Sequence, residues 1–371
     1  MVDKRNRRVA IIGTRGYPSY YGGFETAVRN LAPDLVDRGW DVVVYCRSGQ
    51  VAEVSNGEQV RQAFTPALPS TSLSTLSHGL TSAMHAIFKE RPDVVLMMNV
   101  ANGYWIPLLR VAGIPVAINV DGIEWHRAKW NRLGKLIFKV GAWLSAKFAN
   151  ELIVDAHAIG DYWKDKFGAD SNFIPYGARP DHDPVDLSKH ISFSEYVLIV
   201  ARFVPENSIQ QIINVARELN DEIPFVFVGS GSLEFESQLE DLASRAPNVR
   251  WLGHISDDDY LFSLWENSTV YFHGHTVGGT NPALVQAMHL GAATVARDTV
   301  FNREVLGDAA IFVSDEMNAL VEAIREMRTN IARREQIARD AQKRAQENYT
   351  WPLVNEAYAR VLERQISART I

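Results

Sequence analysis

Two glycine loops in this chain combine residue types that suit phosphate binding. The clearer loop follows the β-branched and aromatic run at 268–272 and contains Gly278, Gly279, Thr280 and Asn281. Asn281 is placed to cap the helix that follows, and Pro282 suits the first turn of that helix. A strand that opens through glycines onto a helix N-terminus offers an anion backbone N–H groups and a positive dipole end. The alternative is an ordinary turn between a strand and a helix of a parallel sheet.

The earlier loop spans residues 13–25 and differs from the fingerprint of a dinucleotide-binding site. That fingerprint has three glycines within about six residues after the strand and an acidic residue about 20 positions later. Here Gly22 and Gly23 follow Gly13 only after an aromatic segment. A loop of this length favours contact with a sugar or a diphosphate, and its candidate residues are Arg15, Gly22, Gly23 and Glu25. Arg15 could equally be an exposed turn residue.

A third candidate is Arg202, which follows the predicted strand at 196–200. The carboxyl ends of parallel strands meet at one edge of a sheet, so we expect Arg202 and the Gly278 loop to share that edge. A guanidinium there can bind a diphosphate through two parallel hydrogen bonds. The alternative is a structural ion pair with Glu206.

Strands and helices alternate along the whole chain, which indicates an α/β fold with parallel sheets. The predicted strands form two series, at 8–12, 41–46, 94–98, 116–120 and 152–155, and at 196–200, 224–228, 249–252, 268–272, 293–296 and 309–313. The polar, proline-bearing segment 180–194 between them has the composition of a linker. One long helix is expected over 318–347, and a last helix follows a break at 349–352.

This order predicts two Rossmann-like domains that face each other across a cleft, with the ligand at the carboxyl ends of the strands. Two domains also suit a chain of 371 residues, since one domain usually takes roughly 150. We place the first domain at residues 1–185, the second at 186–348 and a C-terminal helix at 349–371.

The composition is that of a soluble globular protein. Hydrophobic residues make up 46% and charged residues 22%, and the formal net charge of −6 gives no reason to expect nucleic acid as a partner. The single cysteine, Cys46, excludes a disulfide framework and a cysteine metal cluster. No apolar run reaches the roughly 18 residues that a membrane-spanning helix needs, and the charged N-terminus does not resemble a signal peptide.

Several segments, in order and over nearly the whole chain, resemble retaining glycosyltransferases of family 4, which have the two-domain GT-B fold. They are IGTRGYPSYYGGFET (12–26), VDGIEWHRAKW (120–130), IPYGA (174–178), ARFVPEN (201–207), GGTNPALVQAMHLGAATVA (278–296), FNREVLGDA (301–309) and YTWPLVNEAY (349–358). Within the family, the chain is similar to bacterial rhamnosyltransferases of surface-polysaccharide assembly. The resemblance implies that the second domain binds a nucleotide-sugar donor and that the first binds the acceptor. It also implies that the C-terminal helix packs back on the first domain.

By this resemblance, Arg202 contacts the diphosphate of the donor, and Asn207 stands where the family usually has a partner lysine. Gly278 and Gln286 replace two glutamates that usually contact the sugar and the ribose. Glycine at 278 fits the rhamnosyltransferase subgroup. A glutamine offers one acceptor and one donor group where a carboxylate accepts from two hydroxyls, which suits a dTDP donor without a ribose 2′-hydroxyl. The alternative is a catalytically impaired protein that only binds its ligand.

Asp121 follows the predicted strand at 116–120 and stands where many relatives carry a histidine. This carboxylate is our candidate catalytic group, since it could accept the proton of the acceptor hydroxyl or orient the acceptor. One alternative is an N-cap for the segment that follows. Another is a front-face displacement in which the leaving diphosphate takes the proton.

The acidic run at 257–259 resembles a metal-binding motif, but it directly precedes a predicted helix. That position favours an N-cap with acidic residues in the first turn, so we expect no metal site.

Residues 125–148 predict a basic amphipathic helix. One face carries Leu133, Ile137, Val140, Leu144 and Phe148, and another carries Arg132, Lys135 and Lys139. Such a helix can lie on an anionic membrane, and packing on the domain core with an exposed basic face is the alternative. The basic residues Lys4, Arg5, Arg7 and Arg8 could strengthen the attraction.

Together these features predict a retaining, metal-independent hexosyltransferase of surface-polysaccharide synthesis. It would transfer a deoxyhexose, L-rhamnose from dTDP-L-rhamnose, to a lipid-diphosphate-linked sugar. We expect no cofactor besides this nucleotide-sugar substrate, and a cytoplasmic protein peripherally associated with the inner face of the plasma membrane. A UDP- or GDP-sugar donor and a non-catalytic binding protein are the alternatives. The glycine spacing disfavours an NAD-dependent oxidoreductase.

Overall fold

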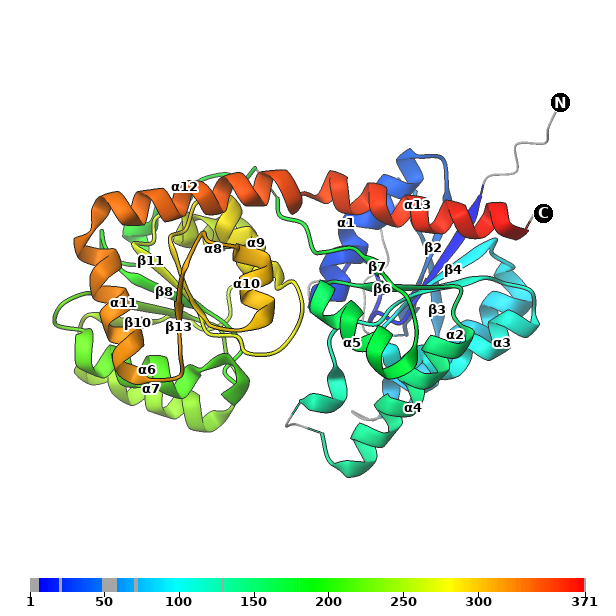
Figure 1. The fold of residues 1–371 in the computed structure, drawn as a ribbon, viewed down its shortest axis with the longest axis horizontal. Helices are drawn as coiled ribbons and strands as arrows, with labels where there is room; N and C mark the ends of the chain where they lie inside the picture. Colours follow the sequence, from blue (N-terminus) through cyan, green and yellow to red (C-terminus); the bar gives the residue numbers. More distant parts are fainter. Residues whose placement is uncertain are drawn as a thin grey trace. The chain divides into compact units, whose positions relative to one another are not determined.

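The structure is a computed structural model, and it describes residues 7–19, 22–48, 59–69, 73–127, 130–179 and 181–369. The chain divides into two compact units (Figure 1). The first comprises Met1–Tyr176 together with Trp351–Ile371, and the second comprises Gly177–Thr350.

Within the described part of the first unit, seven parallel strands form one sheet in the order β3-β2-β1-β4-β5-β6-β7. The strands are β1 Arg8–Ile12, β2 Asp41–Arg47, β3 Arg61–Thr65, β4 Val94–Met98, β5 Val116–Asn119, β6 Glu151–Val154 and β7 Asn172–Phe173. The central strands are apolar along their length because helices cover both faces of the sheet. Every residue of β4, for example, is buried.

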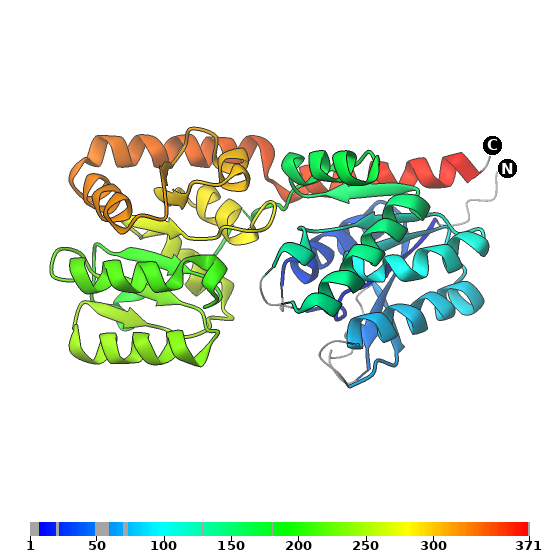
Figure 2. The ribbon, with the colours of Figure 1, turned by 60° about the horizontal axis from the view of Figure 1, so that its bottom comes forward.

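Helices α2, α3 and α4 lie on one face of this sheet, and α1 and α13 lie on the other (Figure 1, Figure 2). The helical segments are α1 Gly23–Asp37, α2 Ser74–His85, the π-helix η1 Ala86–Glu90, the 3₁₀-helices η2 Val100–Trp105 and η3 Glu124–His126, α3 Ile106–Val111, α4 Arg132–Phe148, α5 His157–Phe167 and α13 Trp351–Arg369. The C-terminal helix α13 packs beside α1, and Glu356 of α13 pairs with Arg38 at 2.5 Å. The expected return of this helix to the first domain is confirmed.

In the second unit, the described residues form a six-stranded parallel sheet in the order β10-β9-β8-β11-β12-β13. The strands are β8 Val197–Val200, β9 Phe225–Val228, β10 Val249–Trp251, β11 Val270–His273, β12 Thr294–Arg297 and β13 Ile311–Val313. The helical segments are η4 Leu187–Lys189, η5 Pro205–Asn207, α6 Ile209–Leu219, α7 Leu233–Arg245, α8 Asp258–Glu266, α9 Pro282–His289, α10 Val300–Leu306, α11 Met317–Thr329 and α12 Ile331–Asn348.

Both sheets have the strand order of a Rossmann fold, in which the chain reverses direction between the first strand and the fourth. The reversal lies between β1 and β4 in the first unit and between β8 and β11 in the second. Ligands of such sheets bind outside the carboxyl ends of these two strands. The structure therefore confirms the predicted α/β class and the two Rossmann-like domains.

Helix α6 illustrates how the sequence forms the core of the second unit. Its buried residues are Ile209, Ile212, Ile213, Val215, Ala216 and Leu219. They recur at the spacing of one helical face, and they pack on the apolar strands β8 and β9.

Some predicted elements differ from the structure. The single helix expected over 318–347 is two helices, because Asn330 interrupts it and caps α12 by accepting a hydrogen bond from the Arg333 N–H at 3.1 Å. Strands β3 and β7 were not predicted. Both lie at sheet edges, where β3 is only partly buried and β7 has just two residues.

The boundary between the units lies after Tyr176 and not at residue 185. The segment after Tyr176 belongs to the second unit because it bonds to α8. The Arg179 guanidinium pairs with Asp258 at 3.1 Å, and the Val185 N–H donates to Ser263 Oγ at 2.9 Å. The segment expected to be a linker is thus attached along the surface of one unit.

The acidic run at 257–259 starts α8, as the N-cap interpretation predicts. The Asp257 carboxylate accepts hydrogen bonds from the N–H groups of Asp259 and Tyr260 at 3.0 and 3.2 Å. Asp258 serves the ion pair with Arg179. Within the described ranges, no group of three or more His, Cys, Asp or Glu side chains is arranged to hold a metal ion.

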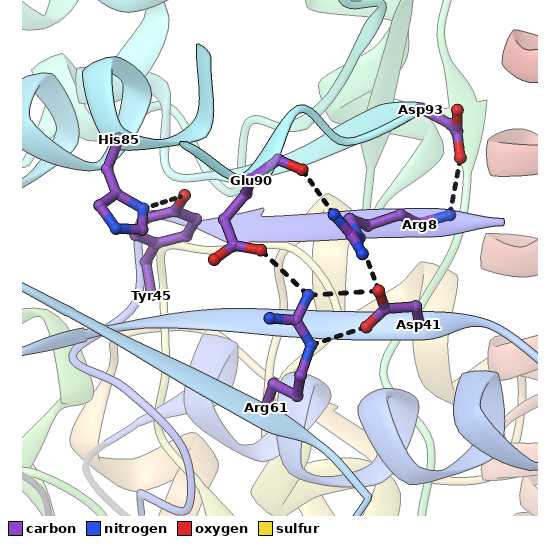
Figure 3. A network of polar contacts seen from close by, with 7 residues as sticks. All are labelled: Arg8, Asp41, Tyr45, Arg61, His85, Glu90 and Asp93. Carbon is purple, nitrogen blue, oxygen red and sulfur yellow. Dashed lines mark hydrogen bonds and ion pairs between the residues drawn. The ribbon is translucent and has the colours of Figure 1, made fainter. Parts of the chain in front are cut away.

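A network of charged side chains joins the amino ends of β1, β2 and β3 (Figure 3). Arg8 donates to Asp41 at 2.5 Å, and Arg61 donates to Asp41 at 2.8 Å and to Glu90 at 3.0 Å. Partial burial alone would raise the pKa of Asp41, but the two guanidinium groups outweigh it and lower that pKa. This network stabilises the sheet at the end opposite to the glycine loops.

The N-terminal basic residues were predicted to attract an anionic membrane, and two of them have other partners. Arg7 pairs with Glu363 of α13 at 2.5 Å, and Arg8 pairs with Asp41. Carboxylates thus compensate part of both charges, and the attraction of Arg7 and Arg8 to a membrane stays a prediction. Lys4 and Arg5 lie outside the described residues.

Candidate functional site

The loops that follow β8 and β11 form one edge of the second unit and are bonded to each other. The Thr276 N–H and hydroxyl both donate to the Glu206 carbonyl, at 2.9 and 2.8 Å. The Ser208 hydroxyl donates to the Gly274 carbonyl at 2.8 Å. These strands flank the point at which the chain reverses direction in the sheet, where a Rossmann fold binds its ligand.

Arg202 lies in the first of these loops with its side chain exposed. No residue that the structure describes accepts a hydrogen bond from its guanidinium or pairs with it, so the alternative of an ion pair with Glu206 is wrong. Asn207 is buried, and its side-chain amide donates to the Arg202 carbonyl at 2.9 Å. Asn207 thus holds the backbone that presents Arg202, and the contact of Asn207 with the donor stays a prediction.

The Gly278 loop has the backbone that its glycines predict. Gly278 has φ +116°, a conformation that L side chains rarely adopt, although a side chain there would meet open space. Backbone conformation therefore favours glycine at this position over the glutamate of the wider family. Gly279 and the buried Thr280 continue the loop toward α9.

Asn281 caps α9 as predicted. Its side-chain oxygen accepts a hydrogen bond from the Ala283 N–H at 2.9 Å, and Pro282 is the first residue of the helix. The N-terminus of α9 therefore follows directly on the glycine loop, and its free N–H groups and dipole favour an anion.

Gln286 is buried in α9, and both of its polar atoms bond to the backbone of Arg179. Its Oε1 accepts from the Arg179 N–H at 2.9 Å, and its Nε2 donates to the Arg179 carbonyl at 2.9 Å. A carboxylate could form only the first of these bonds, because it has no hydrogen to donate. These two hydrogen bonds explain why residue 286 is an amide. Contact of Gln286 with the ribose stays a prediction.

The glycine loop of the first unit packs directly on its neighbour strand. Gly13 has φ +109°, and a Cβ atom there would lie 2.1 Å from the Met98 carbonyl oxygen, so no side chain fits. Glu25 is buried, and its carboxylate accepts a hydrogen bond from the Arg15 N–H at 3.1 Å. Glu25 therefore holds the loop that carries the half-buried Arg15.

Gly22 and Gly23 start α1 at the end of the same loop. Gly22 precedes the helix in extended backbone, with φ −171°. A Cβ atom on Gly23 would lie 2.9 Å from the hydroxyl oxygen of Tyr176, so a larger residue at 23 would require this buried tyrosine to shift.

Asp121 follows β5 and has φ +58°, a backbone conformation that is uncommon for residues other than glycine. Its N–H donates to Asn119 Oδ1 at 2.9 Å, and Asn119 Nδ2 donates to the Tyr358 hydroxyl of α13 at 2.6 Å. The segment after Asp121 is η3, whose N-cap position is Ile123. The N-cap alternative for Asp121 is therefore wrong, and such backbone conformations cluster at functional sites.

Several ionisable groups of the first unit affect the pKa of the buried Tyr176. Burial, with added contributions from Asp121, Asp155, Tyr358 and Glu25, raises the pKa of Tyr176 well above its ordinary value. Glu25, Asp121 and Asp155 follow β1, β5 and β6, so they lie beyond the carboxyl ends of these strands. Sequence reasoning missed Asp155, which the same position after a strand could have identified, and Tyr358, which ends the family segment at 349–358 but was not singled out.

Helix α4 turns a different face to the core than its sequence pattern predicts. The buried residues are Phe138, Gly141, Ala142 and Ser145, and close packing on η2 requires Gly141, where a Cβ atom would lie 2.6 Å from the Val100 carbonyl oxygen. Several large apolar side chains of this helix are exposed instead, namely Leu133, Leu136, Val140 and Trp143. The alternative that packs the apolar face on the domain core is therefore wrong for Leu133 and Val140, which are exposed, whereas Ile137, Leu144 and Phe148 are half-buried.

The basic residues of α4 flank this exposed apolar surface. Arg132 and Lys139 are exposed and Lys135 is half-buried. Lys147 extends over the Trp143 ring, with Nζ 4.9 Å from the ring centroid. The exposed surface of this helix is thus both basic and apolar. Across the residues that the structure describes, no helix is long and apolar enough to cross a bilayer.

The predicted site residues thus form three groups. Arg202, Asn207, Gln286 and the Gly278–Asn281 loop belong to the second unit, Arg15, Gly22, Gly23, Glu25 and Asp121 belong to the first, and Arg132, Lys135 and Lys139 lie on α4.

Two family models match the chain and together cover most of it. The model described as Glycosyltransferase Family 4 matches residues 21–181, and the model described as Glycosyl transferases group 1 matches residues 188–344. The chain is a glycosyltransferase of the GT-B type. No curated protein sequence matches the transferase significantly.

Solved structures share the fold of the transferase over its whole length. Sucrose-phosphate synthase from Thermosynechococcus elongatus is 17% identical with a TM-score of 0.83, and the match covers 98% of this chain and 100% of that one. HepE from Anabaena, in complex with UDP-glucose, is 16% identical with a TM-score of 0.75, over 96% and 99% of the two chains. An α,α-trehalose-phosphate synthase (UDP-forming) from Burkholderia vietnamiensis is 11% identical with a TM-score of 0.74, over 99% and 98%.

Proposed function

We propose that the transferase moves a deoxyhexose from a nucleotide diphosphate donor to a lipid-diphosphate-linked sugar, with retention of the anomeric configuration. The preferred donor is dTDP-L-rhamnose, and the product belongs to a cell-surface polysaccharide. The C-terminal unit binds the donor, and the N-terminal unit binds the acceptor through the Arg15–Glu25 loop and Asp121.

The observation that carries this proposal is the exposed side chain of Arg202, which lies at the same edge of the second unit as the Gly278 loop. An arginine without a partner among the described residues, beside a glycine loop and a helix N-terminus, suits a diphosphate, which accepts bidentate hydrogen bonds from a guanidinium. The same groups can stabilise the negative charge that develops on the leaving diphosphate. We therefore propose that transfer needs no divalent metal.

In the proposed reaction, the bond between the donor sugar C1 and the diphosphate oxygen breaks. A bond forms between C1 and the acceptor hydroxyl oxygen. The hydroxyl proton passes to the leaving diphosphate or to the Asp121 carboxylate. The buried Asn119–Tyr358 pair holds the backbone of this residue through the Asp121 N–H.

A UDP-sugar donor is the second candidate. Structural relatives with the same fold are described as bound to UDP-glucose or as UDP-forming, which favours uridine over thymidine. The weaker candidate, a binding protein without turnover, rests on Gln286 and Asn207. The bonds of Gln286 to Arg179 and of Asn207 to the Arg202 carbonyl supply a structural reason for both residues.

We further propose that the transferase acts in the cytoplasm, at the inner face of the plasma membrane. The exposed Leu136 and Trp143 of α4, flanked by Arg132, Lys135 and Lys139, suit the interface of an anionic bilayer. A lipid-linked acceptor would be held in that bilayer.

The test is a donor panel with a lipid-diphosphate-linked sugar as acceptor. The purified protein is incubated with dTDP-L-rhamnose, UDP-glucose and GDP-mannose, each with and without a metal chelator, and product mass and anomeric configuration are measured. The proposal predicts a rhamnosylated product with retained configuration whose yield the chelator does not change. A product only from a UDP- or GDP-sugar, or one with inverted configuration, would contradict it.

A further inference from the structure

Arg297, the last residue of β12, is a buried cation without a carboxylate beside it. Its exposed fraction is 3%, and its guanidinium forms no ion pair with any Asp or Glu in the described ranges. Burial lowers the pKa of Arg297, and Asp315 offsets this only from beyond ion-pair distance. An arginine nevertheless remains charged at neutral pH. A buried charge that lacks an opposite partner costs stability, so its presence calls for an explanation.

The guanidinium is bonded to the loop that carries Arg202. Its Nε donates to Ser208 Oγ at 2.9 Å, and the Ser208 hydroxyl in turn donates to the Gly274 carbonyl. Its Nη1 donates to the Ser314 carbonyl. Its Nη2 is buried and has no hydrogen-bond acceptor among the described residues, so both N–H groups of this nitrogen are unused.

A second contact joins Arg297 to the loop after β11. The buried Asn302 donates through Nδ2 to the Arg297 carbonyl at 2.9 Å and to the His275 carbonyl at 3.0 Å. Arg297 is therefore attached both to the loop with Arg202 and to the loop with Gly278. Arg202 is the single Lys or Arg in these two loops, residues 201–208 and 274–281. The diphosphate of a nucleotide sugar carries two negative charges, so one guanidinium compensates only part of them.

We infer that Arg297 supplies a second positive charge to the diphosphate site from inside the second unit, as a positioning residue that does not touch the ligand. This inference rests on the proposed donor site. A charge removed from water is screened less than an exposed one, so its field extends into the adjoining loops. Its hydrogen bonds also fix Ser208 and the Gly274 carbonyl, and thereby the two loops that would surround the anion.

The test compares Arg297→Gln, which removes the charge, with Arg297→Lys, which keeps it, and with Arg339→Gln on the exposed surface of α12 as a control. Calorimetry on the full chain measures the affinity for pyrophosphate, dTDP, UDP and thymidine. We expect Arg297→Gln to bind pyrophosphate and dTDP about tenfold more weakly, with thymidine affinity changed less than about twofold. Arg297→Lys should restore most of the pyrophosphate affinity, and Arg339→Gln should match the parent.

Unchanged pyrophosphate affinity in a folded Arg297→Gln protein would overturn the inference. An equal loss for thymidine and pyrophosphate would also overturn it, because the residue would then act only on the fold. If Arg297→Gln does not fold, the test rests on Arg297→Lys. A loss of about tenfold or more in its pyrophosphate affinity would contradict the inference, and retained pyrophosphate affinity would support the inference. A parent protein that binds pyrophosphate but neither dTDP nor UDP would refute the donor proposal and leave the inference on Arg297 intact.

Discussion

At the scale of single residues, the caps could be predicted from the sequence and the long-range bonds could not. Asn281 and Asp257 bond to N–H groups two or three residues ahead, so local sequence suffices to identify them. Gln286 bonds to Arg179, which lies 107 positions away. The sequence already showed that Gln286 departs from the family pattern. The reason for a glutamine at this position became clear only from the folded chain.

Replacing Gln286 by glutamate should destabilise the second unit. The carboxylate that Gln286→Glu introduces would keep the bond from the Arg179 N–H but place its other oxygen against the Arg179 carbonyl. A buried acceptor without a donor costs about 1–3 kcal/mol, so the free energy of unfolding should fall by that amount. Denaturant unfolding checks this, with Gln210→Glu on the exposed face of α6 as the control.

The same variant separates the structural role of Gln286 from a ribose contact. If the amide serves only the Arg179 backbone, dTDP and UDP affinities should change by the same factor in Gln286→Glu. A selective gain in UDP affinity together with unchanged stability would instead support direct contact with the ribose 2′-hydroxyl.

At the scale of elements, buried strands were predictable because a parallel sheet covered on both faces needs continuous apolar runs. The strands at the sheet edges and the exposed faces of helices could not be predicted in this way. The edge strands β3 and β7 have little apolar sequence, and α4 uses the small residues Gly141, Ala142 and Ser145 as its core face. Hydrophobic spacing gives weight to large side chains, so it could not identify these small residues as the buried face of α4.

Helix α4 gives the prediction at this scale. Arg132, Lys135 and Lys139 replaced together by glutamine should weaken binding to anionic vesicles, and so should Trp143→Gln. High salt should release the parent protein in part, since the Debye length falls from about 10 Å at 0.1 M to about 3 Å at 1 M. Vesicle sedimentation measures both effects.

Leu353→Gln is the matched control, because Leu353 of α13 is 50% exposed, as is Trp143. Transfer to a short soluble acceptor should be spared in all variants, since the donor loops are untouched. Variants of α4 that sediment with vesicles as the parent does would show that this helix does not bind the membrane.

At the scale of the whole molecule, alternating strands and helices were enough to predict two Rossmann-like domains. Both sheets follow the same strand order, and each predicted glycine loop lies at the carboxyl end of a strand that flanks the reversal point. The boundary between the two domains was predicted less accurately. The segment after Tyr176 has the composition of a linker but is tied to α8 and α9 by side chains distant in sequence, such as Ser263 and Gln286.

The central claim is that the C-terminal unit binds the donor diphosphate at Arg202, and calorimetry on Arg202→Ala tests it most directly. Loss of a charge-assisted contact should cost about 1.5–3 kcal/mol, so dTDP or UDP should bind roughly ten- to a hundredfold more weakly. The melting temperature should stay the same, because the exposed Arg202 side chain has no partner among the described residues. Arg339→Ala serves as the control. Nucleoside diphosphate affinity equal to that of the parent would contradict the account.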